Sequence, residues 1–236
     1  MVLASLPHGR RFTLALASGM AAFVFGPAVD AAVLAQYTFE QGDPAVFTLD
    51  ATSTAANTNA TAITASPQGT SPDTGVTLIS ESETPGFRID VTSSNNGETE
   101  AANENAYFSF TLTPASGFAF DLDSISIDIQ RGGSTGTRGG FVRTSLDGFA
   151  STVGSVMSAS SAFVVETRDF PDTPTYNNVT EPVTIRVYTI SGGGTFSRSV
   201  HYDDITVNGS VIPEPASLAL AALGGLMIVA RPRKRD

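Results

Sequence analysis

The 236-residue sequence predicts an all-β protein whose central part folds as a two-sheet sandwich. Short segments alternate apolar and polar residues with a period of two, which is typical of half-buried strands. Turns rich in glycine and asparagine separate these segments. Residues 36–212 contain no comparable pattern with the 3.6-residue period of a helix. Many short strands joined by such turns favour a sandwich.

Four segments show the alternation most clearly, and in each the apolar residues would share one buried face. Residues 51–74 differ, because they are rich in Thr, Ala and Asn and hold one large apolar residue, Ile63. We expect an edge strand flanked by long loops there. The alternating segments are Phe87–Val91, Phe108–Leu112, Ile125–Ile129 and Val183–Val187, and the turns include Asn95–Gly97, Pro114–Gly117, Gly132–Gly133, Gly139–Gly140, Asp147–Gly148 and Gly192–Gly194.

Residues 1–35 are expected to be a secretory signal peptide. Arg10 and Arg11 give a positive n-region, an apolar h-region follows, and small residues precede the cleavage site. Cleavage is expected after Ala35, with an alternative after Ala31. General export is favoured over the twin-arginine pathway, because the residues after the arginine pair match the twin-arginine pattern poorly.

The expected mature region, residues 36–212, holds seven arginines against twenty acidic residues, a net charge of −13. Nucleic acid is therefore not expected as a partner, because binding to phosphates needs clustered cations. The region is long enough for one domain with its own core, which we place at residues 36–209. The chain has no cysteine, which excludes disulfides and thiolate metal sites.

The C-terminal part divides into three segments. A linker over residues 210–215 is stiffened by two prolines. Residues 216–230 carry no charge, and as a transmembrane helix they would span about 22 Å, short of a hydrocarbon core of roughly 30 Å. A basic end over residues 231–236 would stay in the cytoplasm. The linker contains Pro213, Glu214 and Pro215, and the basic end contains Arg231, Arg233, Lys234 and Arg235.

The order of these segments resembles the PEP-CTERM sorting signal of exopolysaccharide-producing Gram-negative bacteria. The match runs through Val-Ile-Pro-Glu-Pro at residues 211–215, then Ala-Ser-Leu-Ala-Leu, a glycine-containing apolar run and the Arg-rich end. The resemblance implies an exosortase-type processing enzyme as a partner. It also implies an inner-membrane-anchored precursor that reaches the cell surface or extracellular matrix. Without the Pro-Glu-Pro tripeptide, the tail would indicate a one-pass membrane anchor.

A second resemblance comes from the order of five motifs: Phe108–Pro114, Ile125–Ile129, Arg131–Ser134, Arg143–Phe149 and Tyr202–Gly209. They resemble a jelly-roll domain that recurs in PEP-CTERM proteins and is similar to galactose-binding-like and carbohydrate-binding modules. This resemblance implies a jelly-roll-type sandwich and leaves the ligand open.

The two ends of the expected sandwich each carry an aromatic residue followed by acids, at residues 37–40 and 202–205. In jelly-roll modules, acids at such places often hold a structural Ca²⁺, so the resemblance implies one calcium ion bound by Glu40 and Asp204, with Asp203 as the substitute if a bulge turns it inward. A solvated acidic rim is the alternative. The apolar residues change parity near Asp203, which predicts a bulge or break in the strand.

Catalysis finds little support in residues 36–212. They contain one histidine, His201, which excludes a histidine-based metal cluster, and they contain no nucleophile elbow or phosphate-binding glycine motif. Sugar binding uses flat aromatic faces. Tyr176 and Tyr188 are the rings most open to exposure, although packing against the sandwich is favoured for both.

The sequence therefore favours a non-enzymatic, exported structural or adhesive protein of the cell surface or matrix. The first alternative is a carbohydrate-binding module that acts on exopolysaccharide. The second is an extracellular glycan-active enzyme with a pair of carboxylates, which twenty acidic residues cannot exclude.

Overall fold

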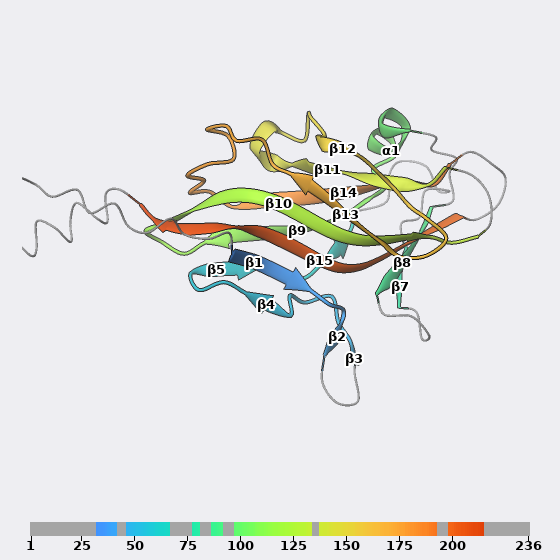
Figure 1. Ribbon diagram of the computed structural model, residues 1–236, viewed down its shortest axis with the longest axis horizontal. Coiled ribbons are helices and arrows are strands. Elements are labelled where there is room, and N and C mark those ends of the chain that lie inside the picture. The colour runs from blue at the N-terminus through green and yellow to red at the C-terminus, as the bar shows by residue number, and fades with distance from the viewer. Residues whose placement is uncertain are drawn as a thin grey trace, which may run out of the picture.

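The chain folds as a sandwich of two antiparallel sheets in a computed structural model (Figure 1). This architecture confirms the predicted all-β, jelly-roll-type class. The structure describes residues 32–41, 46–66, 77–80, 86–91, 97–133, 137–192 and 198–214.

The first sheet, sheet 1, is built around its two longest strands, β10 (Phe118–Arg131) and β15 (Arg198–Pro213). Strand β13 (Val164–Asp169) pairs with the other side of β10. On the other side of β15, β1 (Ala32–Tyr37) covers the C-terminal half and β8 (Phe87–Val91) the N-terminal half. Two short strands extend the sheet: β4 (Ser53–Thr54) beside β1 and β7 (Thr77–Ser80) beside β8.

The second sheet, sheet 2, is centred on β14 (Val183–Ile190), which lies between β11 (Gly139–Thr144) and β9 (Tyr107–Pro114). Strand β12 (Val153–Ser158) forms the edge beside β11. The remaining elements are short: β5 (Thr58–Ala60) and β6 (Thr64–Ala65) beside β9, the hairpin of β2 (Glu40–Gln41) and β3 (Val46–Phe47), helix α1 (Glu98–Asn103) and the 3₁₀ helix η1 (Ser145–Asp147).

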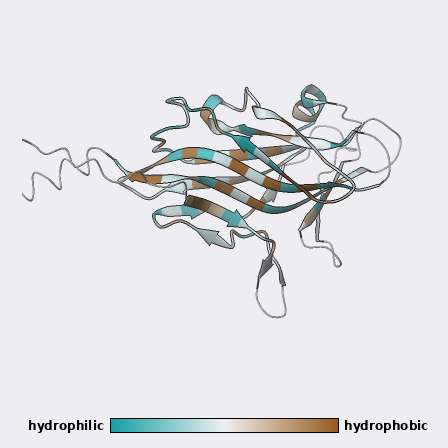
Figure 2. Cartoon of the chain, in the orientation of Figure 1, coloured by the Kyte–Doolittle hydropathy of each residue, from teal (hydrophilic) through white to brown (hydrophobic). Residues whose placement is uncertain are grey.

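The core lies between the two sheets and follows the alternation of the sequence (Figure 2). The predicted apolar residues of β9, β10 and β14 are at most 1% exposed, whereas the polar residues between them are half-exposed. The ring of Phe87 contacts the rings of Phe39, Phe108 and Tyr202 at centroid distances of 4.9, 5.0 and 5.7 Å. The core is therefore centred on aromatic rings supplied by strands of both sheets.

Strand β15 contains the predicted irregularity near Asp203. Between two successive register pairs, β15 has one residue more than β10, and Asp204 takes a φ of 40°. This bulge reverses the parity of the strand, so that Tyr202 and Ile205 are both fully buried. It confirms the prediction and its cause, because a regular strand could not bury two residues three positions apart.

Two local predictions are wrong. Gly139 and Gly140 lie within β11 and form no turn. A Cβ at Gly139 would clash with the carbonyl oxygen of Met157, and one at Gly140 would lie 2.7 Å from that of Tyr188. These glycines therefore serve close strand packing. The single edge strand expected in residues 51–74 is instead three short strands, β4 to β6.

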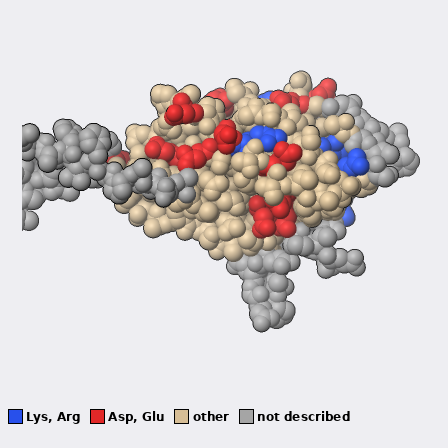
Figure 3. Space-filling view, in the orientation of Figure 1, with Lys and Arg blue, Asp and Glu red and all other residues tan. Residues whose placement is uncertain are grey.

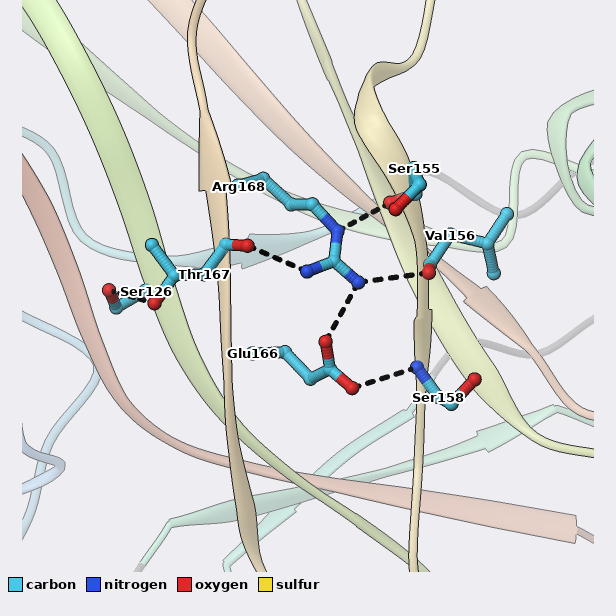
Figure 4. Close-up of polar contacts among 7 residues, drawn as sticks. All are labelled: Ser126, Ser155, Val156, Ser158, Glu166, Thr167 and Arg168. Carbon is cyan, nitrogen blue, oxygen red and sulfur yellow. Dashed lines mark hydrogen bonds and ion pairs between the residues drawn. The ribbon is translucent and has the colours of Figure 1, made fainter.

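Side chains of β13 close one open side of the sandwich (Figure 4). Arg168 Nε and Nη2 donate to the carbonyl oxygens of Ser155 (2.6 Å) and Val156 (2.9 Å) on β12. Glu166 pairs with Arg168 at 2.8 Å and accepts a hydrogen bond from the amide of Ser158 at 3.3 Å. The two edge strands, one from each sheet, are thus joined by side chains, and backbone groups of β12 are occupied.

Both ends of the sandwich reach beyond the expected residues 36–209. Strand β1 begins at Ala32, and β15 continues to Pro213. The amide of Glu214 then donates to the carbonyl of Gly117 at 2.9 Å. Among the described residues, no helix is long and apolar enough to span a membrane. The predicted signal peptide up to residue 31, Pro215, the expected helix and the basic end lie outside them, so they stay predictions.

Candidate functional site

The side of sheet 2 that faces away from the core carries transverse rows of side chains across β11, β14 and β9. Residues that oppose each other in an antiparallel pair lie on the same face, so the strand register defines the rows. We call them the aromatic row (Phe141, Tyr188 and Tyr107), the arginine row (Arg143, Arg186 and Ser109) and the hydroxyl row (Thr184 and Thr111).

The aromatic row forms the floor of this face. The rings of Phe141 and Tyr188 stack with centroids 4.8 Å apart and planes at 1°, and Tyr107 tilts against Tyr188 at 5.1 Å. Helix α1 packs on this row, because Ala101 shares an apolar cluster with the three rings and Ile190 outside the main core. The rings are therefore buried, and they support helix α1 and Arg186, which pack on them.

Arg186 lies on this aromatic floor. Its guanidinium carbon is 4.4 Å from the ring centroid of Tyr107 and 3.6 Å from that of Phe149, distances typical of cation–π contacts. Its Nη1 donates to the hydroxyl oxygen of Tyr188 at 3.4 Å. Within the described part of the chain, Arg186 has no carboxylate partner. Two rings thus hold the position of a half-buried cation, and these residues leave its other N–H groups unused.

Arg143 contacts both the aromatic row and Phe149, the residue whose ring lies on Arg186. Its guanidinium carbon lies 5.0 Å from the Phe141 centroid, and its Nη1 donates to the carbonyl oxygen of Phe149 at 3.2 Å. Phe149 follows η1 and takes a φ of 63°, a left-handed conformation that is unfavourable for a bulky residue. The bond from Arg143 helps to hold this conformation, and with it the ring that contacts Arg186.

Polar groups surround the two arginines. In the hydroxyl row, the side-chain oxygens of Thr111 and Thr184 lie 2.9 Å apart. From α1, Glu98 approaches Arg143 at 3.9 Å and accepts a hydrogen bond from Thr152 at 2.9 Å. The face therefore combines fixed guanidinium donors, hydroxyl groups and one half-exposed ring, that of Phe149.

Charge is distributed unevenly between the two sheets. The strands of sheet 2 contain two arginines and no acidic residue. The whole chain, by contrast, carries a net charge of −10. Figure 3 shows more acidic than basic groups on the face in view. The strands of sheet 2 thus carry a small positive charge on an acidic protein, and the acids beside their outer face include Glu98 and Glu100 of helix α1.

The segments that hold the predicted calcium ligands meet at one residue pair, since Tyr37 of β1 pairs with Ile205 of β15. Glu40 follows in β2, which pairs with β3, whereas Asp203 and Asp204 lie in β15. Asp203 is 8% exposed and accepts a hydrogen bond from the amide of Asp204 at 2.9 Å, while Asp204 is exposed. The side chain of Glu40 is outside the described part. The described residues contain no group of three potential metal ligands, and the calcium site stays a prediction.

Asp128 on β10 adds a carboxylate that the sequence analysis did not single out. Partial burial raises the pKa of its carboxyl above the ordinary value, and the nearby charge of Asp204 raises this pKa further. The bulge thus brings like charges together on the outer face of sheet 1.

The other residues considered as candidates from the sequence lie within strands or pack against neighbouring side chains. His201 lies in β15 with Nε2 3.4 Å from Ser199 Oγ. Tyr176 packs against Phe170 at 5.4 Å and is buried, which confirms packing over exposure. Tyr188 is also buried, within the aromatic row.

The sequence alone does not indicate the arginine row as a site. Arg143 and Phe149 are the first and last residues of one jelly-roll motif, and Arg186 is a polar residue in an alternating strand. A search for arginines at outward positions of predicted strands would have found both arginines. Their pairing across β11 and β14 depends on the strand register, which has no local signal.

No family model and no curated protein matches the chain. Solved structures that resemble it include the family 11 carbohydrate-binding module of the cellulosomal cellulase Lic26A-Cel5E of Clostridium thermocellum, with 14% identity, 69% of this chain and 94% of that chain covered, and a TM-score of 0.35. The family 29 module CBM29_1 from Piromyces equi has 11% identity, coverage of 77% and 93%, and a TM-score of 0.37. The xylan-binding domain CBM22-1 of Paenibacillus barcinonensis Xyn10C has 12% identity, coverage of 76% and 95%, and a TM-score of 0.36. Likenesses at this level do not indicate a shared ligand.

Proposed function

We propose that this protein is an exported, non-catalytic surface protein that binds polysaccharide through the outer face of sheet 2. The observation that carries the proposal is the arginine row, held in place by aromatic rings and flanked by hydroxyl groups. Sugar sites combine an apolar ring with a few fixed polar groups that set orientation. Here Phe149 supplies the ring, and Arg186 and Thr184 supply polar groups.

Pre-organisation supports this role. A free arginine loses side-chain entropy when it orders on a ligand, which reduces the net binding free energy. Arg186 is already fixed by its contacts with Tyr107 and Phe149. The buried rings below it rest on sheet strands, so the donors keep their positions when a ligand binds.

Binding of the purified full chain to a glycan array tests the proposal. We expect binding to at least one polysaccharide and a loss of about tenfold in affinity for Phe149→Ala, because the exposed ring contact disappears. Phe118→Ala is the matched control, since Phe118 is also half-exposed but lies at the end of β10 in sheet 1. No binding to any glycan, or equal losses in the two variants, would refute the proposed face.

The second candidate is a structural or adhesive matrix protein without a glycan site. The polar outer face of sheet 1 favours it, where Ser126 and Thr167 share a hydrogen bond of 2.9 Å and Asn208 donates to Ser124 at 3.2 Å. Such a face offers hydrogen-bonding groups for contacts with a matrix. Incorporation of the protein into an isolated matrix, unchanged by Phe149→Ala, would support this candidate over the first.

For the destination of the protein, we propose that its C-terminal tail acts as a PEP-CTERM sorting signal read by an exosortase-type enzyme. The support is the tripeptide and the order of apolar and basic segments after it. The test replaces Glu214 by Ala in a host that carries exosortase and follows the tail by mass spectrometry. Unchanged release of the tail would refute sorting through the tripeptide and leave a plain membrane anchor.

A further inference from the structure

On the outer face of sheet 2, Arg186 is a cation without a carboxylate partner among the described residues. The strands of this sheet contain no acidic residue, and Glu98 of α1 lies near Arg143. A ligand that covers this face removes water from two guanidinium groups, which costs free energy. A neutral sugar has no charge that would offset this cost. Two neighbouring cations repel, and this repulsion is relieved when an anion binds between or beside them. The charge therefore points to an anionic ligand.

The geometry of Arg186 favours a planar anion. A guanidinium group offers five N–H donors in a rigid fork that matches a carboxylate bidentately. The contacts with the ring faces of Tyr107 and Phe149 use none of its N–H groups for hydrogen bonds, and one N–H bonds weakly to Tyr188. An arginine that is held by rings and keeps further N–H donors is suited to receive one carboxylate.

The low number of cations limits the kind of anion. Nucleic acids and anionic membranes carry dense charge and are bound by larger basic clusters. This face has two arginines, fewer than such clusters use. A polyuronate carries at most one carboxylate per sugar unit, flanked by hydroxyl groups, and so matches both the arginine row and the adjacent hydroxyl row.

Building on the proposed function, we propose that the polysaccharide is acidic and that Arg186 binds a sugar carboxylate, as in a uronic acid. Arg143 is the positioning residue, because it holds the carbonyl of Phe149 and so the ring that fixes Arg186. Thr184 and Thr111 lie one row away, where they can bond hydroxyl groups of the same or the next sugar unit.

Affinity electrophoresis of the full chain tests this proposal. Native gels contain polygalacturonate, alginate or hyaluronate, each compared with its methyl ester, and EDTA in every gel prevents bridging by divalent ions. We expect retardation by at least one acidic polymer and about tenfold weaker binding to its ester, which lacks the charge. Arg186→Gln should weaken binding to the acid about tenfold and leave binding to the ester unchanged.

Two further variants separate fork geometry from plain charge. Arg186→Lys keeps the charge but loses the fork, so we expect it to bind nearly as poorly as Arg186→Gln. Arg131→Gln is the control, because Arg131 lies at the end of β10 and its side chain makes no hydrogen bond or ion pair among the described residues. Full binding by Arg186→Lys, or equal losses in Arg186→Gln and Arg131→Gln, would overturn the carboxylate site.

The test also separates this inference from the proposed function. Equal retardation by a polymer and its ester, lost in Phe149→Ala, would overturn the acidic class while polysaccharide binding stands. Retardation by none of the acidic polymers, together with array binding to neutral glycans, would have the same meaning. Absence of binding in both assays would overturn the proposed function itself.

Discussion

The guanidinium carbon of Arg186 lies 3.6 Å from the ring centroid of Phe149, a residue held in a left-handed conformation. Such a backbone conformation costs roughly 1–2 kcal/mol for a residue with a side chain. The contact between the two residues and the bond from Arg143 to the Phe149 carbonyl offset this cost. Strain in a loop is thus used to place a ring on a cation, an arrangement typical of functional sites.

The conformation of Phe149 predicts different effects for two small substitutions. Both Phe149→Ala and Phe149→Gly lose the ring contact, but glycine adopts a φ of 63° without strain. We expect Phe149→Gly to be more stable than Phe149→Ala by about 0.5–1 kcal/mol in urea unfolding. Both should lose the same affinity for glycan. An alanine variant as stable as the glycine variant would show that the loop relaxes out of the left-handed region.

The position of β1 predicts where the proposed signal peptide would be removed. Cleavage after Ala35 would delete four of the six residues of β1, including the fully buried Leu34. Loss of one buried leucine alone costs about 2–5 kcal/mol. We therefore expect the mature chain to begin at Ala32, after the alternative site at Ala31. Mass spectrometry of the exported protein gives the answer, and a mature N-terminus at Gln36 would contradict it.

The bridge between β13 and β12 predicts a role for Arg168 in both stability and solubility. Arg168→Ala leaves the carbonyl groups of Ser155 and Val156 without this donor and opens two edge strands. We expect a loss of about 1–3 kcal/mol of stability and faster aggregation on mild heating. Arg131→Ala is the control with an arginine outside the bridge. Similar melting temperatures and light scattering for both variants would show that the bridge is dispensable.

Two buried tyrosines predict a loss of stability in alkali. Burial raises the pKa of both Tyr37 and Tyr202 above the ordinary value of 10.0; the charge of Asp50 adds to the shift for Tyr37, and the hydrogen bond with Thr189 opposes it for Tyr202. In the unfolded chain these phenols lose protons near about pH 10, while the folded chain retains them. Stability should therefore fall as the pH rises above about 10 and should not change through these groups below it.

Absorbance at 295 nm, which follows phenolate formation, checks this expectation. We expect the ionisation of Tyr37 and Tyr202 to coincide with loss of the β circular dichroism signal. The Tyr202→Phe variant should lose part of the amplitude that accompanies unfolding. Ionisation of both groups in a chain that stays folded would contradict the prediction.

The calcium prediction requires a comparison of melting temperatures in EDTA and in millimolar Ca²⁺. An ion that binds the folded chain at a hundredfold excess over Kd adds about 2.7 kcal/mol, which raises Tm by roughly 5–10 °C for a domain of this size. Glu40→Gln and Asp204→Asn should each remove most of the rise. Equal melting temperatures of the unmodified protein in the two buffers would refute the site. A rise that survives both substitutions would place the ion elsewhere.

The parts of the fold that could be predicted are those with a local physical cause. Burial in β9 and β10 follows from strict alternation, and the bulge follows from the parity of Tyr202 and Ile205. The turn predicted at Gly139 and Gly140 is wrong, because glycine occurs both in turns and where two strands pack closely. The candidate site could not be predicted, because register brings Arg143 beside Arg186 and a loop conformation places Phe149.

Strand β15 lies inside sheet 1, yet it is the last strand that the structure describes. It pairs with β1, β8 and β10, which come from the beginning and the middle of the chain. A chain that crosses a membrane from its N-terminus therefore cannot complete sheet 1 until residue 198 and beyond have emerged. Until then, the strands that pair with β15 keep unpaired edges. Completion of sheet 1 depends on contacts between residues distant in sequence, which makes folding slow. In the proposed export, folding of this sandwich would therefore be timed by the emergence of β15.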